Sequence, residues 1–106
     1  MNKYLVLYRA KTTAAEQMAQ GDAAQAQAGM DAWMAWAQRA GDAIVDLGSP
    51  LGLVEAGGDS GDPIGGFSIL QAESKEALAE TLKGHPHFMM KDGTIEVVEV
   101  MPMPGA

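Results

Sequence analysis

Two kinds of stretch alternate along the chain. Short runs rich in Leu, Val, Ile and aromatic residues have the composition of strands, and longer runs rich in Ala, Gln and Met have that of helices. Glycine and proline separate them. The pattern predicts strands at residues 3–9, 43–47, 67–72 and 94–101, and helices at residues 22–40 and 74–83.

The longer predicted helix has recognisable ends. Asp22 is a suitable N-cap and Gly41 a suitable residue to end the helix, and a looser helical stretch from Thr12 to Gly21 precedes it. Its apolar residues recur at helical spacing and form one stripe, with Trp36 at the edge. The stripe consists of Ala26, Met30, Trp33, Ala37 and Ala40.

The first and last predicted strands are apolar on both faces. In the first, Tyr4, Val6 and Tyr8 share one face, and Leu5 and Leu7 share the other. The order β-α-β-β-α-β predicts an α+β fold of the ferredoxin-like type, with a four-stranded antiparallel sheet and two helices on one face. The other face then needs a cover, and we expect a second copy of the chain to supply it in a homodimer.

Length and charge narrow the class of protein. The 106 residues suffice for one domain, predicted at residues 1–101 with a Pro/Gly tail at 102–106. Fourteen Asp and Glu outnumber seven Lys and Arg, and this balance disfavours nucleic acid and anionic membranes as partners. No apolar run approaches the ~20 residues of a transmembrane helix, and the apolar start is too short for a signal peptide. We therefore expect a cytoplasmic protein.

Several segments, taken in order, carry a family resemblance. The helix around Trp33 leads into residues 41–52, then come Gly65-Gly66-Phe67, the His85-Pro86 turn and residues 93–97. In this order the chain resembles the YCII-related (DGPF-type) domain family over nearly all of residues 1–101. The resemblance implies a dimeric α+β barrel made of two ferredoxin-like protomers. Relatives in this superfamily include small isomerases, dehydrochlorinases and monooxygenases.

The chain departs from the family at two places. Some members carry a His in the first helix and an Asp before a Pro-Phe turn, proposed as an acid–base pair. Here the first helix has no His, and the turn reads His85-Pro86-His87-Phe88. The resemblance therefore does not transfer that pair to this chain.

The two histidines are the main candidates for chemistry. We expect the segment around Pro86 to be extended, so that His85 and His87 point to the same side. His85 is then a candidate acid–base catalyst with Asp46 as its orienting partner. The alternative is a structural turn packed under a helix end. A metal would need a further ligand, for which Asp46 or Asp92 is available, and we expect neither a metal nor another cofactor.

Other residues are candidates for binding. Tyr8, Trp36, His87 and Phe88 are predicted to line a ligand site, whereas Trp33 is predicted to belong to the core. Asp46, within an apolar strand, is either functional or an edge residue that faces water. The Gly-rich stretch at 57–66 lacks Lys and Arg and is interpreted as a hairpin loop, not a phosphate site.

Two functions of different kinds follow from these candidates. The first is a homodimer that binds a small molecule. The second is a cofactor-independent isomerase or lyase in which His85 transfers a proton. A weaker third hypothesis, an accessory protein-interaction domain, comes only from the association of some DGPF-type relatives with transcription initiation proteins.

Overall fold

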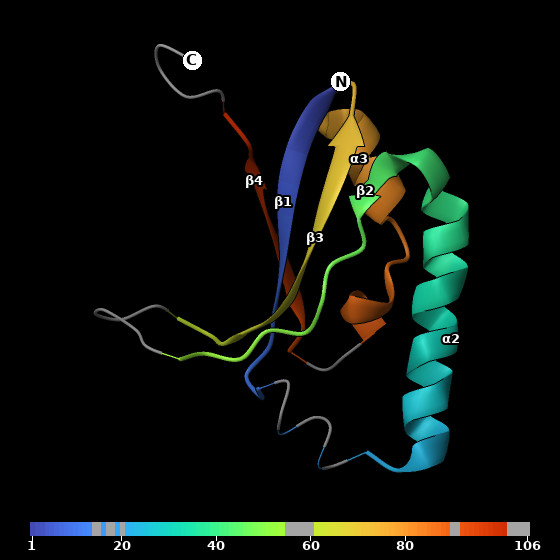
Figure 1. Cartoon of the computed structure of the whole chain (residues 1–106), viewed down its shortest axis with the longest axis vertical. Coiled ribbons are helices and arrows are strands. Elements are labelled where there is room, and N and C mark those ends of the chain that lie inside the picture. Colours follow the sequence, from blue (N-terminus) through green and yellow to red (C-terminus); the bar gives the residue numbers. More distant parts are fainter. Residues whose placement is uncertain (14–15, 17–18, 20, 55–60, 90–91, 102–106) are drawn as a thin grey trace.

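Four strands form one antiparallel sheet in the order β2-β3-β1-β4, with two helices on one of its faces (Figure 1). This computed structural model describes residues 1–106 except 14–15, 17–18, 20, 55–60, 90–91 and 102–106. The elements are β1 (Asn2–Arg9), α2 (Ala23–Ala40), η1 (Gly41–Ala43), β2 (Ile44–Asp46), β3 (Ile64–Ala72), α3 (Lys75–Leu82), η2 (Pro86–Met89) and β4 (Thr94–Glu99). The predicted ferredoxin-like α+β fold is confirmed.

The core lies between the sheet and the helices. Tyr4, Val6 and Tyr8 of β1 point to this side and are buried, as are Leu70 of β3 and Trp36 of α2. The register aligns Tyr4 with Leu70 and Val6 with Ser68, so these positions of the two strands share the helix-covered face. The face of β1 that carries the tyrosines is therefore the helix side, away from any surface that a second sheet would cover.

Helix α2 begins where the sequence predicts and packs differently from the prediction. The Asp22 carboxylate accepts a hydrogen bond from the Gln25 backbone N–H at 2.7 Å, and the Asp22 backbone N–H donates to the Gln25 side-chain oxygen at 3.4 Å, which forms a capping box. Ala26 and Met30 are exposed, so the predicted stripe is wrong over the first turns. Trp36, predicted at the stripe's edge, is fully buried, because its turn of the helix is the one that lies over the sheet.

The segment around Pro86 is helical, and the predicted extended connector is wrong. Residues Pro86–Met89 form the 3₁₀ helix η2, in which the Phe88 N–H donates to the His85 carbonyl at 3.1 Å. Proline has no N–H to lose at the first position of a helix, and its fixed φ suits that position. Pro86 therefore starts a helical turn after His85.

The strand boundaries also differ from the sequence-based ones. Strand β3 starts at Ile64 instead of Phe67, β2 covers only Ile44–Asp46, and β4 ends at Glu99. Gly65 and Gly66, assigned to a loop by composition, continue the strand: Gly66 pairs with Tyr8 of β1, and Gly65 lies at the register shift before Ile64, which pairs with Arg9. Half of the looser helix predicted between Thr12 and Gly21, part of the glycine-rich loop and the tail at 102–106 lie outside the described residues.

A close backbone crossing holds the chain after β2 against β3. Gly48 has φ +91°, and a Cβ built there would lie 1.6 Å from the Phe67 carbonyl oxygen. Such a contact leaves room for glycine alone. The crossing is followed by a bridge between Pro50 and Gly66, so this part of the chain runs beside β3 although β2 itself is short.

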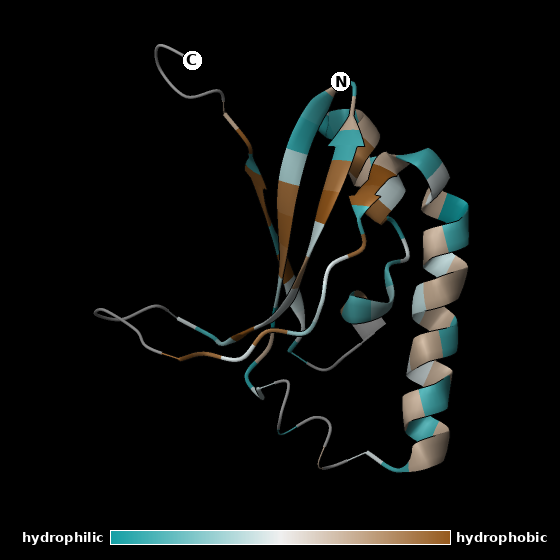
Figure 2. Ribbon diagram, viewed as in Figure 1, coloured by the Kyte–Doolittle hydropathy of each residue, from teal (hydrophilic) through white to brown (hydrophobic). Residues whose placement is uncertain are grey.

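The second face of the sheet carries apolar side chains and has no covering element among the described residues. Leu5 aligns with Ile69 and Val98, and Leu7 aligns with Phe67. These side chains are half-buried except for Val98, which is 42% exposed. Figure 2 shows the hydrophobic colouring of β1, β3 and β4. We call this surface, made of Leu5, Leu7, Phe67, Ile69 and Val98, the open sheet face.

No helix in the described part of the chain is long and apolar enough to cross a membrane.

Candidate functional site at the histidine–aromatic cluster

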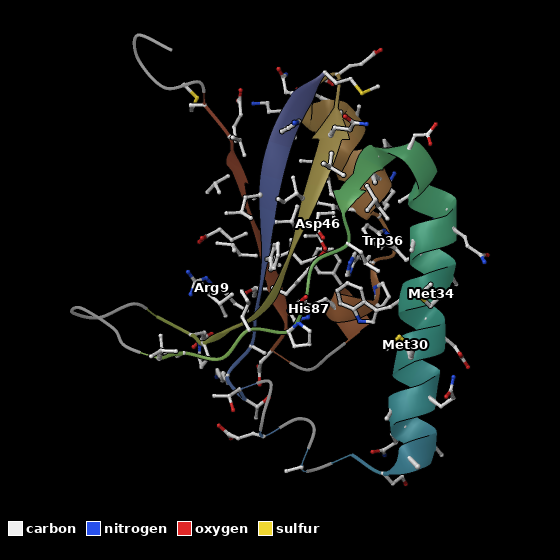
Figure 3. The ribbon with its side chains drawn as sticks, viewed as in Figure 1. Arg9, Met30, Met34, Trp36, Asp46 and His87 are labelled. Carbon is white, nitrogen blue, oxygen red and sulfur yellow. The ribbon has the colours of Figure 1, made fainter. Side chains whose placement is uncertain are left out.

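His85 lies at the centre of a cluster of aromatic rings. It is fully buried, and its ring centroid is 4.3 Å from that of Trp36, 4.5 Å from Trp33 and 4.9 Å from Tyr8. His87 reaches the same cluster through Tyr8, at 5.3 Å. Rings from β1, α2 and the η2 segment thus meet in one place, and Figure 3 shows Trp36 and His87 in the space between the sheet and α2. We call these five residues the histidine–aromatic cluster.

The hydrogen bonding of His85 is incomplete. Its Nδ1 accepts from the backbone N–H of His87 at 3.0 Å, so the neutral ring carries its proton on Nε2. That Nε2 is buried and has no hydrogen-bond partner among the described residues. An unpaired buried donor costs about 1–3 kcal/mol, and such groups are unusual in folded proteins.

The surroundings of His85 disfavour its charged form. Burial, the largest cause, together with the positive charges of His87 and Arg39 lowers the pKa of His85 from 6.5 to about 4. At neutral pH the ring is therefore uncharged. It is a hydrogen-bond donor at Nε2, and it is a weak base.

Tyr8 is fixed by a chain of hydrogen bonds. Its hydroxyl donates to Ser68 Oγ at 2.8 Å, and Ser68 Oγ donates in turn to the Leu47 carbonyl at 2.6 Å. Burial raises the pKa of Tyr8, and the bond to Ser68 opposes this rise in part. Tyr8 therefore presents a neutral ring to His85.

Hydrogen bonds to backbone carbonyls hold Trp36 and His87. The Trp36 indole N–H donates to the Thr81 carbonyl of α3 at 2.9 Å. His87 Nε2 lies 2.8 Å from the Arg9 carbonyl at the end of β1. These bonds join α2 to α3 and η2 to β1, so the positions of the rings depend on all the main layers of the fold.

The structure brings together four of the six residues named from the sequence. Tyr8, Trp36, His85 and His87 belong to the cluster, and Phe88, which follows them, is 55% exposed. Asp46 is exposed, and its carboxylate accepts from the Gly48 N–H at 2.8 Å. Neither ring nitrogen of His85 is hydrogen-bonded to it.

Two members of the site were not predicted as such from the sequence. Trp33 packs against the core as predicted, and its ring also contacts Tyr8 and His85. Ser68 carried no signal, although a serine in an apolar strand is a buried polar group that needs a partner. Its position diagonal to Tyr8 on the neighbouring strand supplies that partner.

The described residues contain no group of three or more His, Asp or Glu that could hold a metal ion. His85 and His87 share a region, but the bonds of their rings lead to backbone atoms of the protein.

Comparison with known proteins identifies the fold and no more. No protein-family model matches the chain, and no curated protein matches it. Among solved structures, it is similar to the 5-chloro-2-hydroxyhydroquinone dehydrochlorinase of Burkholderia phenoliruptrix, determined in complex with 2,5-dihydroxybenzoquinone. The TM-score is 0.56 and the identity 19%, over 95% of this chain and 96% of the enzyme. The chain therefore shares the α+β fold of an enzyme that was solved with a small ligand bound.

Proposed function

We propose that this protein is a homodimer that binds a small planar molecule at the histidine–aromatic cluster. The observation that carries the proposal is the buried Nε2–H of His85, which lacks a hydrogen-bond partner in the described chain. A ligand with an acceptor oxygen would satisfy this donor. The surrounding rings of Tyr8, Trp33 and Trp36 would provide apolar contact to a flat ligand.

Access to the nitrogen requires a neighbouring element to move, because His85 has no exposed surface. The element beside it, η2, is only four residues long, and the hydrogen bonds of a 3₁₀ helix are weaker than those of an α-helix. We expect a ligand to enter by displacing η2, with Phe88 on its outer side. The related fold of an enzyme solved with a dihydroxybenzoquinone supports a ligand of the quinone or phenol class.

Binding suits this geometry better than proton transfer does. A general base works best when its pKa lies near the operating pH, and the pKa of His85 is about 4. Asp46, the proposed orienting partner, is hydrogen-bonded to Gly48 instead. In an isomerase or lyase, the neutral His85 would serve as a hydrogen-bond donor that polarises a substrate carbonyl.

The homodimer rests on the open sheet face. Leu5, Leu7, Phe67, Ile69 and Val98 form an apolar surface that no described element covers. Surfaces of this kind on a sheet usually mark an interface. A second sheet packed against the first would bury them and leave the histidine–aromatic cluster on the other side of each sheet.

Calorimetric titration with 2,5-dihydroxybenzoquinone and hydroquinone tests the ligand site. We expect binding by the unaltered protein and a loss of about tenfold or more in the His85→Phe variant, which keeps a flat ring and removes the N–H. Both tryptophans of the chain lie in the cluster, so their fluorescence should change on binding.

The Asp46→Asn variant separates the two functional hypotheses. This substitution keeps an acceptor for Gly48 and removes the charge. Unchanged affinity agrees with binding at the cluster, whereas a large loss would support a His85–Asp46 pair. The proposal of binding through His85 is overturned if His85→Phe binds as tightly as the unaltered protein, or if neither compound binds at millimolar concentration.

A further inference from the structure

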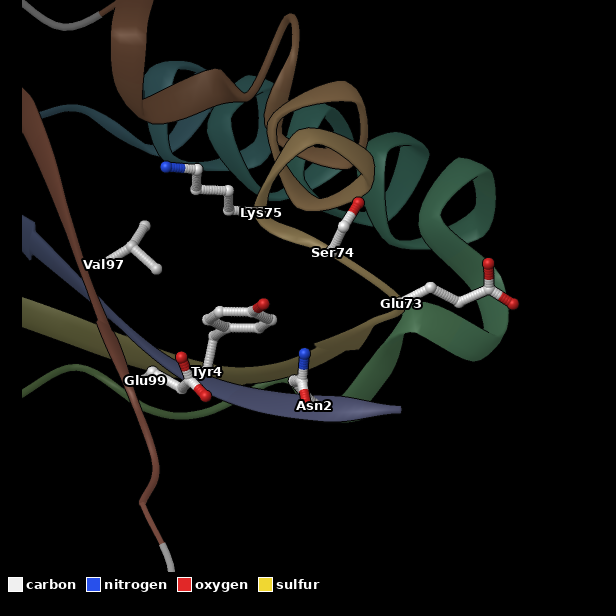
Figure 4. Close-up of a pocket in the computed structure, with 7 residues that line it drawn as sticks. All are labelled: Asn2, Tyr4, Glu73, Ser74, Lys75, Val97 and Glu99. Carbon is white, nitrogen blue, oxygen red and sulfur yellow. The ribbon is translucent and has the colours of Figure 1, made fainter.

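A cavity lies at the opposite end of β1 from the histidine–aromatic cluster. It has a volume of about 600 Å³ and lies on the helix side of the sheet, between β1, β4 and the start of α3 (Figure 4). Ligand sites commonly measure about 300–1,000 Å³. It is lined by Asn2, Tyr4, Glu73, Ser74, Lys75, Val97 and Glu99.

Tyr4 presents an unpartnered hydroxyl to this cavity. The residue is only 5% exposed, and its hydroxyl has no hydrogen-bond partner in the part of the chain that the structure describes. Tyr8, two residues along the same face of β1, donates its hydroxyl to Ser68. The equivalent neighbour of Tyr4 on β3 is apolar, so the hydroxyl points into the cavity, toward the start of α3 (Figure 4).

Charges of opposite sign stand on separate walls of the cavity. In Figure 4, Lys75 and Glu99 lie on opposite sides of the Tyr4 ring, and the carboxylate of Glu73 points away from both. Neither Lys75 nor Glu99 forms an ion pair with another described residue. The cation and the anion are thus both available to a ligand.

The start of α3 strengthens the preference for an anionic group beside Lys75. Ser74 is the N-cap, and its Oγ accepts from the Ala77 N–H, which leaves the backbone N–H groups of Lys75 and Glu76 at the helix end without intrahelical acceptors. A helix N-terminus favours negative charge. The apolar surface of Val97 and the Tyr4 ring lies between Lys75 and Glu99.

We infer that this cavity binds a small zwitterion, a free amino acid with an apolar side chain. Its carboxylate meets Lys75 and the first turn of α3, and its ammonium meets Glu99. The Tyr4 hydroxyl, which can donate and accept, bonds the carboxylate, and the side chain of the ligand lies on Val97 and the Tyr4 ring. The site is independent of the histidine–aromatic cluster, because the two share no residue.

The test uses leucine and two derivatives, each lacking one charge, in titrations followed by NMR chemical shifts of the full chain. N-acetylleucine retains the carboxylate, and leucinamide retains the ammonium. We expect leucine to bind at least about tenfold more tightly than either derivative, as the loss of a charge-assisted hydrogen bond implies. The shifts should appear at Tyr4, Lys75 and Val97.

Single substitutions test which residue binds the carboxylate of the ligand and which binds its ammonium. Lys75→Met should weaken leucine and N-acetylleucine and leave leucinamide unaffected, whereas Glu99→Gln should weaken leucine and leucinamide only. Tyr4→Phe should weaken leucine without lowering stability, because its hydroxyl has no protein partner to lose. Lys83→Met, at the other end of α3 and outside the lining, is the matched control and should change nothing.

The inference is overturned if N-acetylleucine or leucinamide binds as tightly as leucine, or if no chemical shift changes at millimolar leucine. It is also overturned if Lys75→Met weakens the binding of leucinamide, or if Glu99→Gln weakens the binding of N-acetylleucine. A negative result with leucine does not affect the proposal of a ligand site at the histidine–aromatic cluster. That proposal is tested by the affinity for quinones and phenols and by the fluorescence of the tryptophans.

Discussion

The state of single side chains decides what the cluster can do. His85 is held neutral by burial, and one of its nitrogens is occupied by the backbone of His87. The residue therefore offers a donor at Nε2, and this role is insensitive to pH over the physiological range. Asp46, for which the sequence left open a functional role or a position on an edge strand facing water, is exposed on the edge strand β2 and closes a turn at Gly48.

Acid should destabilise the fold through His85. The unfolded chain takes up a proton on this residue below pH 6.5, whereas the native protein does so only near pH 4. The unfolding free energy should therefore fall as the pH drops from about 6.5 to about 4, by up to about 3 kcal/mol from this residue. Urea unfolding at a series of pH values measures this fall in the unfolding free energy.

The His85→Phe variant isolates that contribution, since it retains every other titrating group. Its unfolding free energy should vary less between pH 6.5 and 4 than that of the unaltered protein. Equal slopes for the two proteins would show that His85 does not titrate as described.

The site could be predicted from the sequence only as far as local signals reach. Gly84 and Pro86 mark a turn, which places His85 and His87 in one segment. Their conformation was missed because proline fits both an extended chain and the start of a helix. Trp33 and Ser68 enter the site through contacts between distant segments, and no local pattern encodes these contacts.

At the scale of elements, the order of strands and helices was predictable and their ends were not. Apolar composition and capping residues located every strand and both main helices, including the Asp22 cap. The start of β3 at Ile64 depends on pairing with β1, which overrides the loop character of two glycines. The burial of Trp36 in preference to Met30 depends on how far α2 extends past the sheet.

Replacement of two glycines by alanine should change the stability of the protein in opposite directions. Gly48→Ala places a Cβ against the Phe67 carbonyl at a positive φ, so we expect a loss of about 3 kcal/mol or more, or failure to fold. Gly29→Ala, in α2 with no atom within 4 Å of its Cβ, should stabilise by about 0.5–1 kcal/mol. Thermal unfolding of both variants measures the difference. Similar stabilities would contradict the close crossing after β2.

At the scale of the whole molecule, the two faces of the sheet differ in what covers them. The helix side holds the histidine–aromatic cluster and the cavity at Tyr4, and the open sheet face is available to a second copy. The need for a cover follows from the alternation of apolar residues in β1, and it could be read from the sequence. The side of the sheet that the tyrosines face could not be predicted from the sequence, because both faces of that strand are apolar.

Two neighbouring valines test the homodimer. Val98→Glu places a charge on the open sheet face, and we expect the mass in light scattering to fall from twice 11.1 kDa to 11.1 kDa. Val97→Glu, on the opposite face of the same strand, should leave the dimer intact. A monomer at micromolar concentration for the unaltered protein would refute the homodimer.

The position of β1 has a consequence for synthesis. Among the described strands it precedes both of its neighbours in the chain, β3 and β4, and lies between them in the interior of the sheet, and β4 is made after the other three. A growing chain can pair β1 with β3 early, but the other edge of β1 stays unpaired until β4 emerges from the ribosome. During that interval an interior strand with apolar side chains is exposed as an edge, a state prone to pairing with other chains. Pairing of β4 with β1 is therefore the step that removes this exposed edge from the sheet.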